Sequence, residues 1–218
     1  METSQLHTLF LIIHLFGVAI GAGGAFTSDG IFFASLRDKK ISKDEFGIMK
    51  YSSQMTWLGL ILLIISGVGL FGMNPEYLSQ SAKFLLKMTI VGTLLLNGIV
   101  FHLAHLPFIG KHVGELLVKK NKPNDLEDTP YLLFSGVVSL TSWVLAIILG
   151  ALGGIPVSYL LGLALYIGLI GLGTIISSLL FSKFLSSKNI KITFRIGIAS
   201  VGLALLVLVM AHIQPYLM

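Results

Sequence analysis

Charged residues are scarce in this sequence of 218 residues, and cysteine is absent altogether. The lack of cysteine excludes disulfides, thiolate-bound metals and iron–sulfur clusters. Asp, Glu, Lys and Arg together make up only 11% of the chain, whereas about 25% is usual in a soluble domain. With a mean hydropathy of +0.90, the chain has too few polar side chains to cover a water-exposed surface. A water-soluble domain of this size is therefore excluded.

What the sequence has instead is a series of long apolar stretches. A transmembrane helix needs about 20 consecutive apolar residues, and six stretches reach that length, at about 6–36, 55–73, 83–106, 132–152, 157–182 and 194–214. Because lipid cannot hydrogen-bond the backbone, each span must be helical. The sequence predicts an all-α, polytopic helical bundle that contacts membrane lipid and forms a single transmembrane domain over 1–218.

The basic residues are distributed unevenly among the connections between spans. Lys and Arg gather after the first, third and fifth spans, whereas the connections at 74–82 and 153–156 contain neither. Cytoplasmic loops carry such an excess. We therefore expect these loops in the cytoplasm and both termini outside, in a membrane of the bacterial cytoplasmic type. The net charge of +5 is then a topology signal and does not indicate nucleic acid.

Two pairs of spans resemble each other. Ser53-Gln-Met-Thr-Trp57 in the second span resembles Ser139-Leu-Thr-Ser-Trp143 in the fourth, and Gly-Thr pairs at 92–93 and 173–174 follow in the next spans. The similarity predicts that the hairpin of spans two and three is repeated in parallel as the hairpin of spans four and five.

Polar residues within spans are costly and usually functional, and in this chain they fall into two layers. The outer layer contains His7 at the membrane boundary, His14 at a depth of about 12 Å by the helix rise, and His212 near the outer end of the last span. Two lysines and three methionines share this level: Lys83, Lys87, Met73, Met88 and Met210.

His14 is the leading ligand candidate of the outer layer. Neutral imidazole is a common axial ligand of haem iron. Gly17 and Gly21 follow one and two turns later and could leave space beside the ring for a flat macrocycle. The plainer interpretations are a histidine that hydrogen-bonds a neighbouring helix and glycines that serve helix packing.

The rest of the outer layer could complete a haem b site between spans one, three and six. His212 would be the second iron ligand if the first and sixth helices approach each other, and Lys83 and Lys87 could pair with the propionates. Two histidine ligands would indicate electron transfer with a redox partner. One ligand would leave an iron position open for the chemistry of a membrane oxidoreductase.

Two other functions remain open. The first is copper binding or copper transport, because imidazole and thioether ligands suit Cu(I). Its ligand set would be His14, His212, Met73, Met88 and Met210. The second is a structural or accessory subunit without a cofactor, whose glycine faces serve assembly, including assembly with further copies of the chain.

The inner layer provides weaker candidates. His102 and His105 are three residues apart, so on an α-helix they would share a face and could hold one metal ion. Histidines that face headgroups or water are the plainer interpretation. Asp29 lies at a comparable level late in the first span. A proton pathway through Asp29, Asn97 and His102 is conceivable, but these residues are sparse.

The first half of the chain resembles a known group of membrane proteins. The resemblance is carried by His14-Leu-Phe-Gly-Val-Ala-Ile-Gly-Ala-Gly-Gly-Ala-Phe26, a basic loop, the stretch 57–72, and Lys87 at the start of a Leu/Val-rich span. These segments look like the first three spans of the group that includes the copper-resistance D-type membrane domain and the bacterial haem-b protoporphyrinogen oxidase. The resemblance implies that His14 is associated with haem and that Lys87 lies near the site.

The chain also departs from the pattern of that group. The tryptophan expected shortly after the histidine is missing, and the region of Ser28 and Asp29 replaces the arginine expected near the end of the first span. The chain also has six expected spans instead of four. Protoporphyrinogen oxidation is therefore not carried over.

Overall fold

The computed structural model describes residues 3–38, 40–114, 129–153, 156–183, 185 and 187–213, which form helices and no strands. Within these residues, six helices are long and apolar enough to cross a membrane. This confirms the predicted all-α membrane bundle. The spans are α1 (Thr3–Asp38), α2 (Lys43–Met73), a continuous helix of α4 (Ala82–Val100), η1 (Phe101–His105) and α5 (Leu106–Lys111), then α6 (Thr129–Ala151), α7 (Tyr159–Leu180) and α8 (Ser187–Ile213). A short helix, α3 (Pro75–Gln80), joins α2 to α4.

Two spans begin earlier than their apolar stretches indicate. α2 begins at Lys43 instead of 55, because a capping box starts it. The Ser42 hydroxyl accepts the backbone N–H of Glu45 at 3.2 Å, and the Glu45 carboxylate accepts the backbone N–H of Ser42 at 2.7 Å. These bonds satisfy backbone donors that a helix start leaves without partners. α8 likewise begins at Ser187 instead of 194, so polar turns extend these helices beyond their apolar cores.

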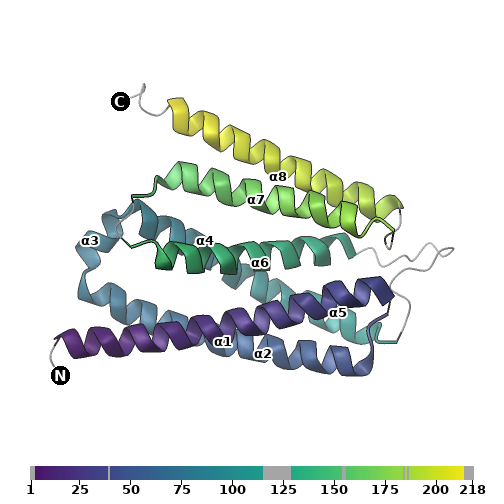
Figure 1. Ribbon diagram of the computed structural model, residues 1–218, viewed down its shortest axis with the longest axis horizontal. Coiled ribbons are helices and arrows are strands. Elements are labelled where there is room, and N and C mark those ends of the chain that lie inside the picture. The colour runs from purple at the N-terminus through teal and green to yellow at the C-terminus, as the bar shows by residue number, and fades with distance from the viewer. Residues whose placement is uncertain are drawn as a thin grey trace.

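The six spans are arranged in three layers of two helices (Figure 1). α1 and α2 form one outer layer, α4 and α6 the middle layer, and α7 and α8 the other outer layer. α1 begins and α8 ends at the same end of the bundle, as an even number of spans requires. Which end faces outward stays a prediction. Four of the lysines behind that prediction, Lys39, Lys119, Lys120 and Lys122, lie outside the described residues.

Small residues hold each outer pair together. A Cβ on Gly59 of α2 would overlap the backbone N and Cα atoms of Gly21 on α1. In the other pair, a Cβ on Gly171 of α7 would lie 2.9 Å from the backbone oxygen of Gly197 on α8. Close approach of backbones at small residues is a usual means of helix association in membranes, where lipid competes equally for apolar side chains. Both outer layers are therefore tightly packed helix pairs.

An apolar cluster fills the end of the bundle at which α1 ends and α2 begins. We call it the Leu36 cluster, and its buried members are Phe32, Leu36, Ile41, Met49, Ile109, Leu132, Leu133 and Leu185. They come from α1, α2, α5, α6 and the connections that precede α2 and α8. This end of the bundle is closed by apolar side chains.

Candidate functional site

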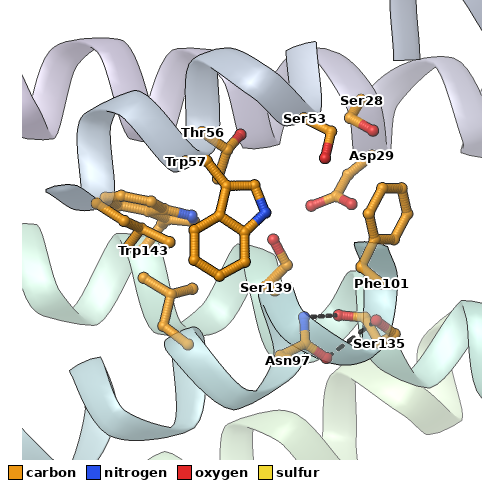
Figure 2. A pocket seen from close by; sticks show the side chains of 13 residues that line it. Ser28, Asp29, Ser53, Thr56, Trp57, Asn97, Phe101, Ser135, Ser139 and Trp143 are labelled. Carbon is orange, nitrogen blue, oxygen red and sulfur yellow. Dashed lines mark hydrogen bonds between the residues drawn. The ribbon is translucent and has the colours of Figure 1, made fainter. Parts of the chain in front are cut away.

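A small cavity lined by both apolar and polar side chains lies inside the bundle between α1, α2, α4 and α6 (Figure 2). Its polar lining is Ser28, Asp29, Ser53, Thr56, Asn97, Ser135 and Ser139. The cavity has a volume of about 40 Å³, and one water molecule needs about 10–15 Å³ on the same measure. The cavity can therefore hold a few atoms of water size, and it is far too small for a haem.

Asp29 is the one ionisable side chain among the residues that line the cavity. Its Oδ2 atom is buried and has no hydrogen-bond partner among the described residues. The Ser139 hydroxyl of α6 points toward the carboxyl group and interacts with it. An ideal Cβ built on Gly136 would lie 3.8 Å from Oδ1, so the backbone of α6 passes close to the acid. A carboxyl group in a membrane without a cationic partner is costly, and its retention points to a functional role.

Two further buried polar atoms of the lining have no partner among the described residues. They are the Ser28 hydroxyl oxygen and the indole Nε1 of Trp143, which can only donate. Buried polar groups are normally hydrogen-bonded, and isolated ones are usually satisfied by ordered water. A cavity with both unmet acceptors and an unmet donor suits polar contents such as water or a hydrated cation.

Asn97 and Ser135 fix one wall of the cavity. The Asn97 amide donates to the backbone oxygen of Ser135 at 3.1 Å, and the Ser135 hydroxyl donates to Asn97 Oδ1 at 2.9 Å. Asp29 and Asn97 thus line the same cavity. This agrees with part of the proton pathway considered from the sequence, which ran through Asp29, Asn97 and His102. His102 is not part of the lining, because it lies outside against the edge of Trp57, with ring centroids 6.4 Å apart.

The segments that suggested an internal repeat meet at this cavity. Ser53 and Trp57 reach it from α2, and Ser139 and Trp143 reach it from α6. The repeat itself stays a prediction, but the serine and tryptophan of both segments line the same cavity. Four polar residues of the lining were not predicted from the sequence: Ser53, Thr56, Ser135 and Ser139. The available signal was the spacing of Ser135, Ser139 and Ser142 along one face of an apolar span.

His14 is bound to the neighbouring helix. Its Nδ1 atom lies 2.9 Å from the hydroxyl oxygen of Ser66 on α2. Ser66 donates its only proton to the backbone oxygen of Leu62 at 2.6 Å, so in a neutral imidazole it must accept from Nδ1–H. This assigns the proton to Nδ1 and leaves the lone pair on Nε2. Lys87 lies near enough to interact electrostatically with the ring.

The expected approach of the first and sixth helices is wrong. α1 and α8 lie in opposite outer layers, with α4 and α6 between them (Figure 1). His212 is exposed near the end of α8, so it is not brought to His14. Each outer helix pairs with its sequence neighbour through glycines, and this packing keeps the two pairs apart. The residues present therefore do not fit a haem held by these two histidines between spans one, three and six.

The space expected beside the glycines of α1 is filled. A Cβ on Gly17 would lie 3.0 Å from the Leu63 side chain, and one on Gly21 would lie 2.5 Å from the Trp143 ring. The glycines therefore serve helix packing and do not leave room for a macrocycle.

The two lysines of α4 face the end of α6. Lys83 Nζ donates to the backbone oxygens of Leu152 and Gly153. Leu152 and Gly153 directly follow Ala151, the last residue of α6, and a cation at the C-terminal end of a helix interacts favourably with the helix dipole. Lys83 is thus a helix cap and is not free to pair with a propionate. Lys87 lies one turn deeper, and an ideal Cβ on Gly150 would be 3.7 Å from its Nζ.

The inner histidines do not share a face. They lie in η1, a π-helical turn, in which each turn contains more residues than in an α-helix. Residues three apart are therefore spread further around the axis, and His105 is buried while His102 is exposed. In the described part of the chain, no group of three or more His, Asp or Glu side chains could hold a metal ion.

The expected copper ligands are also scattered. Met88 on α4 and Met210 on α8 are 42% and 62% exposed, respectively, and α8 lies in the layer opposite to α1. Met73 ends α2 and His7 is exposed near the start of α1. The structure does not gather these side chains into one site.

Comparison with known proteins finds no relative: no family, no curated protein and no solved structure matches the chain. The resemblance to the copper-resistance D-type and haem-b oxidase group therefore stays a prediction.

Proposed function

We propose that this chain binds a small monovalent cation inside the membrane at Asp29 and carries it across the bilayer. The observation that supports the proposal is the buried Oδ2 atom of Asp29, a residue that lines the cavity; this atom has no partner among the described residues. A single carboxylate is neutralised by one positive charge, either a proton or an alkali metal ion. In many transporters, coupling ions bind between transmembrane helices near the middle of the bilayer.

The chemistry of the lining favours a hard cation. Hydroxyl and amide oxygens surround the carboxyl group, and oxygen ligands suit hard cations in preference to soft metals such as Cu(I). The volume of about 40 Å³ admits an ion with few waters. It excludes larger organic substrates, whose sites usually have about 300–1,000 Å³.

The two tryptophans of the chain provide a direct assay, because both line the cavity. The intrinsic fluorescence of the purified protein in detergent, with His102→Gln as background because that ring contacts Trp57, should change on titration with protons, Na⁺ or K⁺. Asp29→Asn should abolish that change, because the amide cannot be ionised. Asp44→Asn is the matched control, since Asp44 is exposed in the first turn of α2. If none of the three cations alters the emission, or if Asp29→Asn responds like the wild type, the proposal is wrong.

Transport is tested separately in liposomes. Reconstituted wild-type protein should carry the responding cation down an imposed gradient, and Asp29→Asn should not. A flux that survives in Asp29→Asn would show that Asp29 is not the site that the cation must visit.

Haem b bound at His14, away from the packed glycines of α1 and without His212, is the second candidate function. The supporting observation is the hydrogen bond to Ser66, which orients the ring and leaves the Nε2 lone pair available as a ligand. The protein expressed with haem supplied should then show a Soret band that His14→Ala removes. His212→Ala and His7→Ala should leave the band unchanged, because His212 belongs to α8 in the opposite outer layer and His7 is exposed. A wild-type protein without a Soret band ends this candidate.

A further inference from the structure

A row of hydroxyl groups continues from the cavity toward the end of the bundle at which α7 begins. On α4, Thr89, Thr93 and Asn97 follow one another at intervals of four residues and therefore lie along one face. On α7, Tyr159 and Tyr166 are seven residues apart and also share a face. α4 and α7 pack together, so the two faces can meet.

Two hydrogen-bonded pairs of hydroxyl groups lie along this row. Nearest to the cavity, the Tyr166 hydroxyl lies 2.7 Å from the Ser142 hydroxyl of α6 and also interacts with Thr93. Tyr166 is 3% exposed and Ser142 is fully buried. Nearer the end of the bundle, the Tyr159 hydroxyl lies 3.1 Å from that of Thr89.

The serine and threonine protons determine the direction of these bonds. Ser142 donates to the backbone oxygen of Val138 at 2.6 Å, and Thr89 donates to that of Leu85 at 3.0 Å. Each hydroxyl has one proton, so Tyr166 donates to Ser142 and Tyr159 donates to Thr89. We define the polar seam as Thr89, Thr93, Ser142, Tyr159 and Tyr166.

The spacing of the seam suits bridging water. Successive residues of the α4 row are about 6 Å apart along the helix axis. A single water that makes two hydrogen bonds of about 2.8 Å spans nearly that distance. This spacing along α4 is compatible with single bridging waters between Thr89, Thr93 and Asn97, and Thr89 is bonded directly to Tyr159.

Toward the opposite end of the cavity, the described residues are mainly apolar. One turn beyond Asp29, the Leu36 cluster begins with Phe32 of α1, and its α6 members Leu132 and Leu133 precede Ser135. The buried hydroxyl of Ser35 on this side bonds to Glu45 at 3.2 Å. The five hydroxyl groups of the polar seam favour access to Asp29 from their side, although Tyr159 and Tyr166 also pack in an apolar cluster.

We infer that protons reach Asp29 along the polar seam from the end of the bundle at which α7 begins, with the Tyr166 hydroxyl as the central relay. Each oxygen of the seam accepts one proton and passes its own proton to the next group, and for this step the Thr89 and Ser142 hydroxyls turn away from their backbone acceptors. The last proton binds Asp29 Oδ2, so the carboxylate becomes a carboxylic acid and the seam is restored. This inference rests on the proposed cation site and specifies its cation as the proton.

Stopped-flow pH jumps followed by tryptophan fluorescence test the inference. The experiment uses the full chain in detergent with His102→Gln as background, so that no imidazole contacts the reporter Trp57. The other nearby ionisable ring, His105, contacts Phe101 of the lining, and His105→Gln is measured in parallel. Lys87 and His14 belong to the other half of α4 and α1 and do not line the cavity.

Tyr166→Phe keeps the aromatic ring and removes only the relay hydroxyl. It should slow the fluorescence change by at least about tenfold, as expected when a positioned proton-transfer group is lost, and leave the final amplitude unchanged. Tyr131→Phe should not alter the rate, because Tyr131 is an exposed tyrosine at the start of α6. A purely structural role for Tyr166 would change stability or amplitude but not the rate alone.

The outcomes separate this inference from the proposed function. If Asp29→Asn loses the amplitude while Tyr166→Phe keeps the wild-type rate, the relay is refuted and the cation site is retained. If Asp29→Asn keeps the amplitude, the cation site itself is wrong. Should Tyr166→Phe fail to fold, Thr93→Val removes the neighbouring hydroxyl at constant shape. The same slowing supports the seam, and an unchanged rate refutes it.

Discussion

Asn97 and Ser135 exchange two hydrogen bonds across the interface between α4 and α6, at 3.1 Å and 2.9 Å. One of the two acceptors is the backbone oxygen of Ser135. Asn97 is therefore bound both to the backbone of α6 and to the Ser135 side chain. The contact fixes the distance between the two helices of the middle layer at the level of the cavity.

Removal of this contact should destabilise the bundle. Asn97→Leu keeps the volume and loses both bonds, and we expect a loss of about 1–2 kcal/mol in the free energy of unfolding, given typical values for hydrogen bonds between membrane helices. Unfolding in a denaturing detergent, followed by circular dichroism, provides the measurement. Thr27→Val is the control, because the exposed Thr27 hydroxyl bonds only to its own helix at Gly23. Equal losses in both variants would contradict the role assigned to the interhelical pair.

The contact between α1 and α2 leads to a second prediction. Gly59→Ala should lower the free energy of unfolding by about 1–3 kcal/mol, as overpacking does elsewhere, because its Cβ would overlap the backbone of Gly21. Gly67→Ala, on the same helix, should have little effect, since a Cβ there meets nothing within 4 Å. The two variants share the same change in helix propensity, so their difference isolates the packing. If they lose equal stability, the close approach at Gly59 is not as described.

The lysine at the end of α6 leads to a third prediction. Lys83→Met keeps an unbranched apolar side chain and removes the hydrogen bonds to the backbone oxygens of Leu152 and Gly153, which directly follow α6. We expect a loss of about 1–2 kcal/mol in the free energy of unfolding, from charge-assisted bonds and the helix dipole. Lys50→Met, at an exposed position on α2, should be nearly neutral. A Lys83→Met protein as stable as the wild type would exclude the capping role.

The orientation of the bundle is tested with reporters. A reporter that is active only in the cytoplasm should be silent when it is fused after Met218 and active when it is inserted near Asn121, because the basic connections are expected inside. The opposite pattern would reverse the bundle. The polar seam would then open toward the cytoplasm instead of the outside.

The spans could be predicted from the sequence because hydropathy is summed over some twenty residues and needs no knowledge of packing. The sequence did not allow us to predict which helices pack against each other. The spans are apolar on nearly all sides, so no polar face marks which side meets a neighbouring helix. The pairing of α1 with α2 follows from the fit of Gly21 against Gly59, which is visible only once both helices are in place. For the same reason, the prediction that His14 and His212 lie close together is wrong.

The site shows the same division. Asp29 could be singled out as a polar residue within a span, because such residues are rare. Its surroundings are supplied by three other helices, and Ser139 lies far from it in the sequence. Isolated serines on apolar spans are common helix residues that bond their own backbone. Their role in the cavity therefore depends on the fold and is not marked in the local sequence.

The π turn of η1 has a consequence for how the length of this chain can vary during evolution. A π turn arises when one extra residue is accommodated in an α-helix, while the helix on either side keeps its phase. Deletion of a single residue between Phe101 and His105 would convert the turn to regular α-helix. Leu106 and Ile109 would then still face the interior. A single-residue deletion within α4 or α6 would instead rotate every later side chain by about 100°. Homologues one residue shorter are therefore expected to have lost that residue at η1.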